Sequence, residues 1–144
     1  MHVDGVLRAK GTDIVSVAPS ATLQSAAALL QERQIGALLV LDQEGQLCGI
    51  VSERDLVSSI AQFGASALAS TVSECMTSEV VTCTSTDTLE QLMAIMTERR
   101  IRHLPVVDND RLVGVISIGD VVKRRLGEVS DEARALSDYI TLGR

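Results

Sequence analysis

One stretch of this chain occurs twice, and that duplication restricts the possible folds more than any other feature of the sequence. Residues 22–42 align with residues 88–108 at a constant offset of 66, and residues 47–57 align with residues 112–122 at an offset of 65. Fourteen of the 32 aligned positions are identical, and the offset changes in a turn that is one residue shorter in the second copy. Because repetition at a fixed period indicates a repeated structural unit, we expect two copies of one fold.

Residues 100–120, which read RIRHLPVVDNDRLVGVISIGD, show the organisation of the unit most clearly. Residues 106–108 and 112–116 are aliphatic runs separated by a polar Asn-Asp-Arg turn, which predicts a tight hairpin of two buried strands. Ser117 and Asp120 follow the second strand, where a helix should begin.

Each copy should place a strand and a helix before its hairpin and a second helix after it. In the first copy we expect a strand at 14–17, an amphipathic helix that includes residues 23–30, a hairpin of 35–42 and 47–52, and a helix at 53–62. In the second copy the first strand is expected at 80–83.

The helices of the second copy carry clear end signals. Thr88 with Gln91 makes a capping box for the first of them. We expect this helix to bury Leu89, Leu92, Met93 and Met96. The second helix should run from Asp120 to Leu126, with cations on its last turns, and Gly127 should end it.

These elements predict an α/β (α+β) module of two pseudo-symmetric strand-helix-strand-strand-helix repeats. We expect a first repeat at 1–64 with a lead-in at 3–10, a linker at 65–72, a second repeat at 73–126 and a C-terminal helix at 127–144. Ser130 should cap this last helix. Its apolar stripe must cover another surface, and consists of Val129, Ala133, Leu136 and Ile140.

Charge and composition argue against several functional classes. The chain has 144 residues with 13 basic and 19 acidic side chains, a net charge of −6, and only Phe63 and Tyr139 as aromatic residues. It lacks the basic surface and the stacking platform of nucleic-acid binders, so we expect no nucleic-acid partner. No apolar run is long enough to span a membrane and no secretory signal is visible, so we expect a cytoplasmic protein without a membrane partner.

The cysteines and histidines offer little catalytic chemistry. Cys48, Cys75 and Cys83 lack C-x-x-C spacing, and the only histidines are His2 and His103. We interpret the cysteines as small buried hydrophobic residues, because a nucleophilic role would need a base beside the sulfur. Since no cluster has metal-ligand spacing either, we expect neither an enzyme nor a metal site.

The two Ser-x-x-Asp pairs, Ser52 with Asp55 and Ser117 with Asp120, have two interpretations. Each pair is itself a capping box, in which the aspartate compensates the helix N-terminus. A carboxylate at the mouth of a cleft could also accept hydrogen bonds from a ribose diol. The two roles are compatible.

The two copies differ just before the hairpin. Gly36 and Ala37 in the first copy correspond to Arg102 and His103 in the second. Arginine suits phosphate oxygens, and a protein of net charge −6 needs such local positive charge to bind an anion. A solvated helix end with cations is the alternative interpretation, but Arg102 and His103 stand where a buried strand should begin.

Two further cations could supply charge to a ligand. Arg54 lies between Ser52 and Asp55, and its counterpart in the second copy is Gly119. Lys10 lies in the lead-in and could reach a phosphate. Both are equally well interpreted as plain surface residues.

The doubled Gly-h-h-Ser-x-x-Asp motif, in which h is aliphatic, and the run IRHLPVVD resemble a tandem pair of CBS domains, the cystathionine-β-synthase type. The resemblance covers roughly residues 5–126 and is closest to small stand-alone bacterial members. It implies clefts between the repeats that bind adenosine nucleotides. In the family, main chain around the first strand of a repeat binds adenine, the motif aspartate binds ribose, and the residues before Leu-Pro-Val approach the phosphates.

Transferred to this chain, the resemblance implies two sites. One would use Thr12, Asp13, Ile14 and Val15 with Ser52 and Asp55. The other would use Ser78, Glu79, Val80 and Val81 with Ser117 and Asp120. Arg102 and His103 match the phosphate-facing positions, whereas Gly36 and Ala37 depart from them, so equal occupancy of the two sites is not expected.

The residues and the resemblance together predict a non-catalytic sensor of an adenine nucleotide, with AMP, ADP, ATP and NAD(H) as candidate ligands. Such a regulatory module would signal through a change in conformation or assembly. It would form a homodimer, as family pairs commonly do, and act on an effector protein. The alternatives are an enzyme and a structural dimerisation module whose clefts stay empty.

Overall fold

The structure is a computed structural model that describes residues 2–127. The expected C-terminal helix, with its Ser130 cap and apolar stripe, lies outside these residues. The predicted α/β fold class is confirmed, with two small sheets that each carry a hairpin. The elements are α1 Val3–Lys10, β1 Ser16–Val17, α2 Leu23–Arg33, β2 Ala37–Leu41, β3 Leu47–Ser52, α3 Glu53–Phe63, the 3-10 helix η1 Gly64–Ala69, α4 Val72–Cys75, α5 Leu89–Arg99, β4 His103–Asp108, β5 Arg111–Ser117 and a helix at 118–127.

Both predicted hairpins are present. β2 pairs antiparallel with β3, and β4 pairs antiparallel with β5. The β4–β5 turn consists of Asn109 and Asp110, with φ angles of 50° and 63°. Positive φ at both central residues is the requirement of a two-residue type I′ turn, and Asn and Asp tolerate it better than most side chains.

The predicted strand at 80–83 is wrong, because only Cys83 pairs with the sheet, through a single bridge to Val106. In the first repeat, the Leu39 N–H donates to the Val15 carbonyl at 3.2 Å and extends the pairing upstream of β1. The position equivalent to Leu39 is Pro105, which has no N–H to donate. The second sheet therefore has two strands where the first has three.

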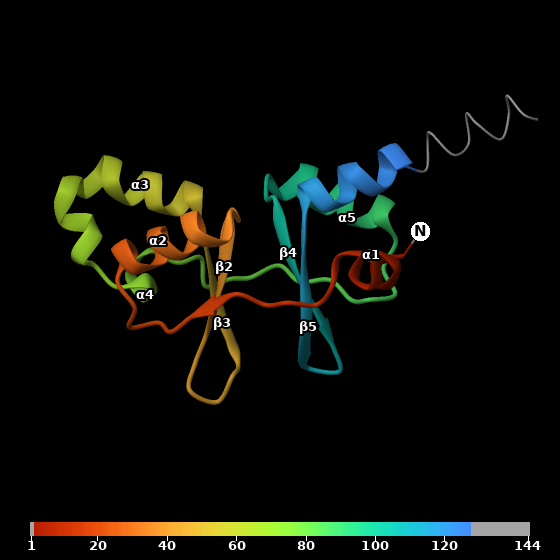
Figure 1. Ribbon diagram of the computed structural model, residues 1–144, viewed down its shortest axis with the longest axis horizontal. Coiled ribbons are helices and arrows are strands. Elements are labelled where there is room, and N and C mark those ends of the chain that lie inside the picture. Colours follow the sequence, from red (N-terminus) through yellow and green to blue (C-terminus); the bar gives the residue numbers. More distant parts are fainter. Residues whose placement is uncertain (1, 128–144) are drawn as a thin grey trace, which may run out of the picture.

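The lead-in is a helix that belongs to the core of the other repeat. Val3, Val6 and Leu7 of α1 are buried in the core formed by α5, β4 and β5. In Figure 1, α1 lies beside the second repeat, and the chain then crosses to β1 in the first. The i, i+3, i+4 spacing of these three residues is a helical signal that the sequence reading did not use.

The segment expected to be a linker contributes to the first core. Ala67 of η1 is buried there, and so is Val72, the first residue of α4. Each core thus receives a short helix that precedes the opposite repeat in the chain. The proposed divisions at 64 and 72 stay a prediction.

The glycines of the two repeated motifs, Gly49 and Gly114, lie where a residue in or just after a short helix packs closely against the strand. A Cβ on Gly114 would lie 2.7 Å from Leu7 Cδ2 of α1, and a Cβ on Gly49 would meet the sulfur of Met76, just after α4. A larger side chain at either position would displace the side chain of Leu7 or Met76. Identity at these two positions therefore follows from close packing.

Two smaller expectations are also corrected. Met93 is 40% exposed, whereas Leu89, Leu92 and Met96 are the buried residues of α5 and Ile95 packs partly buried beside them. Gly127 is still helical and does not have the left-handed φ of a glycine that ends a helix. Within residues 2–127, no helix has both the length and the apolar character needed to cross a membrane.

Cys83 is expected to resist alkylation in the folded protein. It is 3% exposed, and burial, followed by the charges of Asp87 and Asp108, raises its pKa to about 12. Because the thiolate is the reactive form, only about one molecule in ten thousand is reactive at pH 8. Mass spectrometry after iodoacetamide treatment should find Cys83 modified only in urea, whereas Cys48 and Cys75, which are partly exposed, react first. Equal rates for all three cysteines would contradict this.

Candidate functional site

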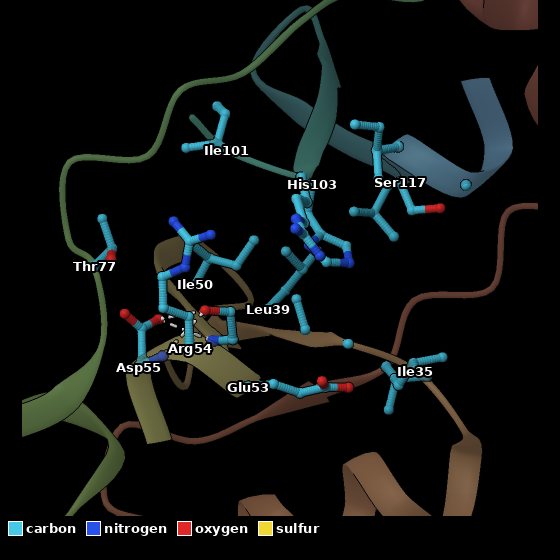
Figure 2. Close-up of a pocket in the computed structure, with 18 of the residues that line it drawn as sticks. Ile35, Leu39, Ile50, Glu53, Arg54, Asp55, Thr77, Ile101, His103 and Ser117 are labelled. Atoms are coloured by element: carbon cyan, nitrogen blue, oxygen red, sulfur yellow. Dashed lines mark hydrogen bonds between the residues drawn. The ribbon is translucent and has the colours of Figure 1, made fainter. Parts of the chain in front are cut away.

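A cavity of about 1130 Å³ lies between the two repeats. Its walls come from both hairpins, from the starts of α3 and the 118–127 helix, and from the segments before β1 and after α4 (Figure 2). Most of the residues expected from the sequence line it, namely Asp13, Val15, Ser52, Arg54, Asp55, Glu79, Val80, Val81, Arg102, His103, Ser117 and Asp120. Thr12, Ile14 and Ser78 do not. The two sites implied by the resemblance are therefore parts of one continuous cleft.

The resemblance grouped residues 12–15 with Asp55 and residues 78–81 with Asp120. In the structure, the segment that leaves α4 starts beside Asp55, and the segment that leaves α1 starts beside Asp120. Thr77 exchanges two backbone hydrogen bonds with Ile50 of β3, so the segment after α4 lies against the Asp55 side. Figure 2 shows Thr77 beside Arg54 and Asp55 and away from Ser117. Lys10, at the end of α1, instead contacts Asp120. We call these the Asp55 half and the Asp120 half of the cleft.

Both Ser-x-x-Asp pairs form the capping boxes that the sequence predicted. The Ser52 N–H donates to Asp55 Oδ2 at 2.9 Å, and the Asp55 N–H donates to Ser52 Oγ at 3.3 Å. Ser117 and Asp120 make the same two bonds at 2.9 Å and 3.1 Å. Capping uses only Oδ2 of each carboxylate. Among the described residues nothing donates to either Oδ1, so a carboxylate oxygen is left for a ligand in each half.

Gly36 of the first repeat and His103 of the second lie close together across the cleft. A Cβ on Gly36 would lie 3.2 Å from Cε1 of the His103 ring and 3.6 Å from Glu53 Oε1. The imidazole of the second repeat thus occupies the space that the missing side chain of the first leaves open. A Cβ at position 36 would require the His103 ring to shift by a few tenths of an ångström.

The charges that line the cleft are balanced in number, although the whole chain carries −6. The cationic side chains are Lys10, Arg33, Arg54, Arg100 and Arg102. The acidic side chains are Asp13, Glu53, Asp55, Glu79 and Asp120. The lining of the cleft is therefore less negative than the chain as a whole. Among residues 2–127, no group of three or more His, Cys, Asp or Glu side chains could hold a metal ion.

Sequence reasoning missed several lining residues at the ends of α2 and α5. Gln34 and Arg100 line the cleft and have left-handed φ angles of 54° and 56°. The Arg100 carbonyl accepts a hydrogen bond from Arg54 Nη1 at 3.4 Å, which links the two repeats across the cleft. Their equivalent places in the repeat, directly after a helix, were a signal that could have found them.

His103 should make the stability of the fold depend on pH. Burial lowers its pKa; Glu53 and Asp120 oppose that shift, and Lys10 and Arg102 add to it. Since the unfolded chain then binds the proton more tightly, stability is full above about pH 6.5 and is lost as pH falls from there toward the lowered pKa.

The melting temperature of His103→Gln should therefore fall less between about pH 7.5 and 5.5 than that of the wild type, as measured by circular dichroism. His2→Gln, at an exposed position, is the control and should follow the wild type. Parallel profiles for wild type and His103→Gln would exclude this role.

Comparison with known proteins gives one consistent family. The family model for the CBS domain matches residues 10–62 and residues 72–127. The chain is 34% identical to the CBS domain-containing protein CBSX3 of Arabidopsis thaliana, over 85% of this chain and 61% of that protein. It is 33% identical to the CBS domain-containing protein YhcV of Bacillus subtilis, over 83% and 84% of the two chains.

Three solved structures share the fold. A CBS-domain containing protein from Agrobacterium tumefaciens is 48% identical with a TM-score of 0.85, covering 86% of this chain and 92% of that one. The CBS domain pair of protein MJ0100, in complex with 5′-methylthioadenosine and S-adenosyl-L-methionine, is 25% identical with a TM-score of 0.79 over 89% and 98%. CBSX2 in complex with AMP is 28% identical with a TM-score of 0.71 over 88% and 96%.

Proposed function

The chain belongs to the CBS domain family, and from that membership we propose that it is a regulatory module that senses an adenine nucleotide in the cleft between its two repeats. AMP, ADP, ATP and NAD(H) are the candidate ligands. The module is non-catalytic and signals through a change in conformation or assembly. A ligand can drive such a change only as far as it binds the two states differently.

The observation that carries this proposal is the single cleft with one motif aspartate in each half. Each aspartate keeps one carboxylate oxygen outside its capping box, in position to accept from a ribose hydroxyl. The volume of about 1130 Å³ exceeds what one drug-sized ligand usually fills, so two mononucleotides or one dinucleotide would fit.

Adenine would lie between aliphatic side chains. Val15, Leu39, Ile50, Val80 and Ile101 line the cleft, and none of its lining residues is Phe, Tyr or Trp. The ligands of the two similar complexes, AMP in one and S-adenosyl-L-methionine with methylthioadenosine in the other, share the adenosine moiety. For this chain the arginines favour a phosphate at the other end of the ligand.

The assembly we propose is a homodimer that passes its signal to an effector protein. Its interface would cover the apolar side chains exposed on α3 and the 118–127 helix, namely Val57, Ile60, Phe63, Ile118, Val122 and Leu126. Both helices lie along the same edge of the molecule in Figure 1. The three cysteines are unpaired, which suits the reducing cytoplasm that we propose as its location.

Titration calorimetry with AMP, ADP, ATP, NADH and S-adenosyl-L-methionine tests the proposal. Binding of at least one adenine nucleotide, without its turnover, is the expected result. No heat from any of them, with an intact dimer in light scattering, would replace the sensor with a structural dimerisation module. Conversion of a nucleotide during the incubation would show an enzyme.

Arg102→Ala should weaken the binding of AMP by about tenfold and that of adenosine by less than about threefold. Arg102 is exposed in the cleft, where its guanidinium would donate to phosphate oxygens but not to the nucleoside. Arg111→Ala is the control, because Arg111 is exposed at the hairpin turn and does not line the cleft. Equal losses for AMP and adenosine would remove Arg102 from the phosphate role.

A further inference from the structure

The two motif aspartates, although equivalent in the repeat, are in different states. Lys10 Nζ lies 2.6 Å from Asp120 Oδ2 and donates to the Val115 carbonyl at 2.8 Å. The side chains of Lys10 and Asp120 are 32% and 22% exposed. Asp55 Oδ2 accepts only from the backbone and hydroxyl of Ser52, and within residues 2–127 no ion pair reaches it. One motif aspartate is therefore ion-paired with a cation and, among the described residues, the other is not.

A ribose diol that binds both oxygens of the Asp120 carboxylate must compete with this ammonium group for Oδ2. Burial alone raises the pKa of Asp120, but the hydrogen bonds from Lys10 and Ser117 outweigh it and keep the carboxylate charged. If a ribose diol replaces Lys10, the ammonium is left in the cleft beside Arg102 and His103, which share that wall. The ammonium would then lose its direct ion pair, although Glu53 also lies near His103, and an anionic group on the ligand would replace the lost partner.

Lys10 is placed to change partners without leaving the site. It is the last residue of α1, which is anchored in the core of the repeat that carries Asp120. A lysine ammonium has three donors on a flexible stem. One donor can stay on the Val115 carbonyl while another turns from the Asp120 carboxylate to a phosphate oxygen.

We propose that Lys10 is a specificity-determining residue of the Asp120 half: it moves from Asp120 to the ligand's phosphate when the ribose takes the carboxylate. This half therefore selects a phosphorylated adenosine over adenosine, whereas the Asp55 half accepts the nucleoside as well. The inference rests on the proposed function, since it assumes that an adenine ligand enters the cleft.

The test is calorimetry with AMP and adenosine on Lys10→Met in an Asp55→Ala background, which removes the carboxylate of the other half. Lys10→Met should weaken AMP by about tenfold, since a charged hydrogen bond to phosphate is lost. It should tighten adenosine by about two- to fivefold, since the competing ion pair is gone. Lys10→Gln keeps a donor for the Val115 carbonyl without the charge. It should likewise weaken the binding of AMP and tighten that of adenosine.

Opposite changes for the two ligands cannot come from a general loss of stability. Arg8→Met, on the same helix with a partner on the exposed surface, should change neither affinity. Equal changes for AMP and adenosine, or no binding in the Asp55→Ala background while the wild type binds AMP, would overturn the role of Lys10 and leave the proposed function intact. Failure of both ligands to bind the wild type would overturn the proposed function, and this inference with it.

Discussion

Asp55→Ala is expected to weaken AMP binding in its half of the cleft by roughly 2 to 4 kcal/mol, or about 30- to 1000-fold in the dissociation constant. The change removes a charged acceptor that could hold two ribose hydroxyls. Asp55 is the more informative of the two motif aspartates because no lysine competes for it. Titration calorimetry of AMP on the wild type and the variant measures the loss.

The control must separate ligand binding from helix capping, because Asp55 also belongs to the capping box of α3. Gln91 completes the same capping box on α5 and does not line the cleft. Gln91→Ala should therefore lower the melting temperature, through a loss of about 1 kcal/mol, and leave AMP affinity unchanged. If Asp55→Ala also lowers only the melting temperature, the aspartate is a cap and nothing more.

Leu92→Ala is expected to lower the free energy of unfolding by roughly 2 to 5 kcal/mol. Leu92 is 0% exposed and lies among the buried side chains of α1, α5, β4 and β5. Its truncation removes the free energy gained by burying the deleted methyl groups and leaves a cavity that a close-packed core fills only in part. Urea unfolding followed by circular dichroism gives the value.

The neighbouring residue on the same helix is the matched control. Met93 was expected in the buried face from its spacing, but the structure leaves it 40% exposed. Met93→Ala should cost less than Leu92→Ala, about 1 kcal/mol, because 40% of Met93 stays exposed in the folded protein and alanine favours the helix. Similar losses for Leu92→Ala and Met93→Ala would mean that the helix is rotated from the orientation described above.

Several parts of the fold could be predicted because their causes lie close together along the chain. The capping boxes join residues three apart, and the β4–β5 turn depends on two adjacent residues, Asn109 and Asp110. The strand expected at residues 80–83 is absent, which shows where prediction from neighbouring residues alone fails. Residues 80–83 have the composition of a strand, but their pairing depends on the partner at position 105, which is a proline.

The candidate site also combines residues that sequence patterns predicted with a contact that only the tertiary structure reveals. The repeat pointed to Asp55 and Asp120, and the asymmetry between copies pointed to Arg102 and His103; all four line the cleft. Lys10 was named as a cation that could reach a phosphate, but its contact with Asp120 could not be predicted, since it joins residues 110 positions apart. No pattern around Lys10 indicates that distance.

The amino-acid sequence by itself determined that the chain is a doubled unit with two hairpins and two capped aspartates, because periodicity, turns and caps depend on neighbouring residues. Only the tertiary structure decided which segment faces which aspartate. α1 packs on the second core and α4 on the first, so the connecting segments cross between the repeats. The physical reason is that local interactions do not favour either way of connecting the two repeats. The packing of α1 and α4 on the cores, which joins residues far apart in the sequence, selects one of them.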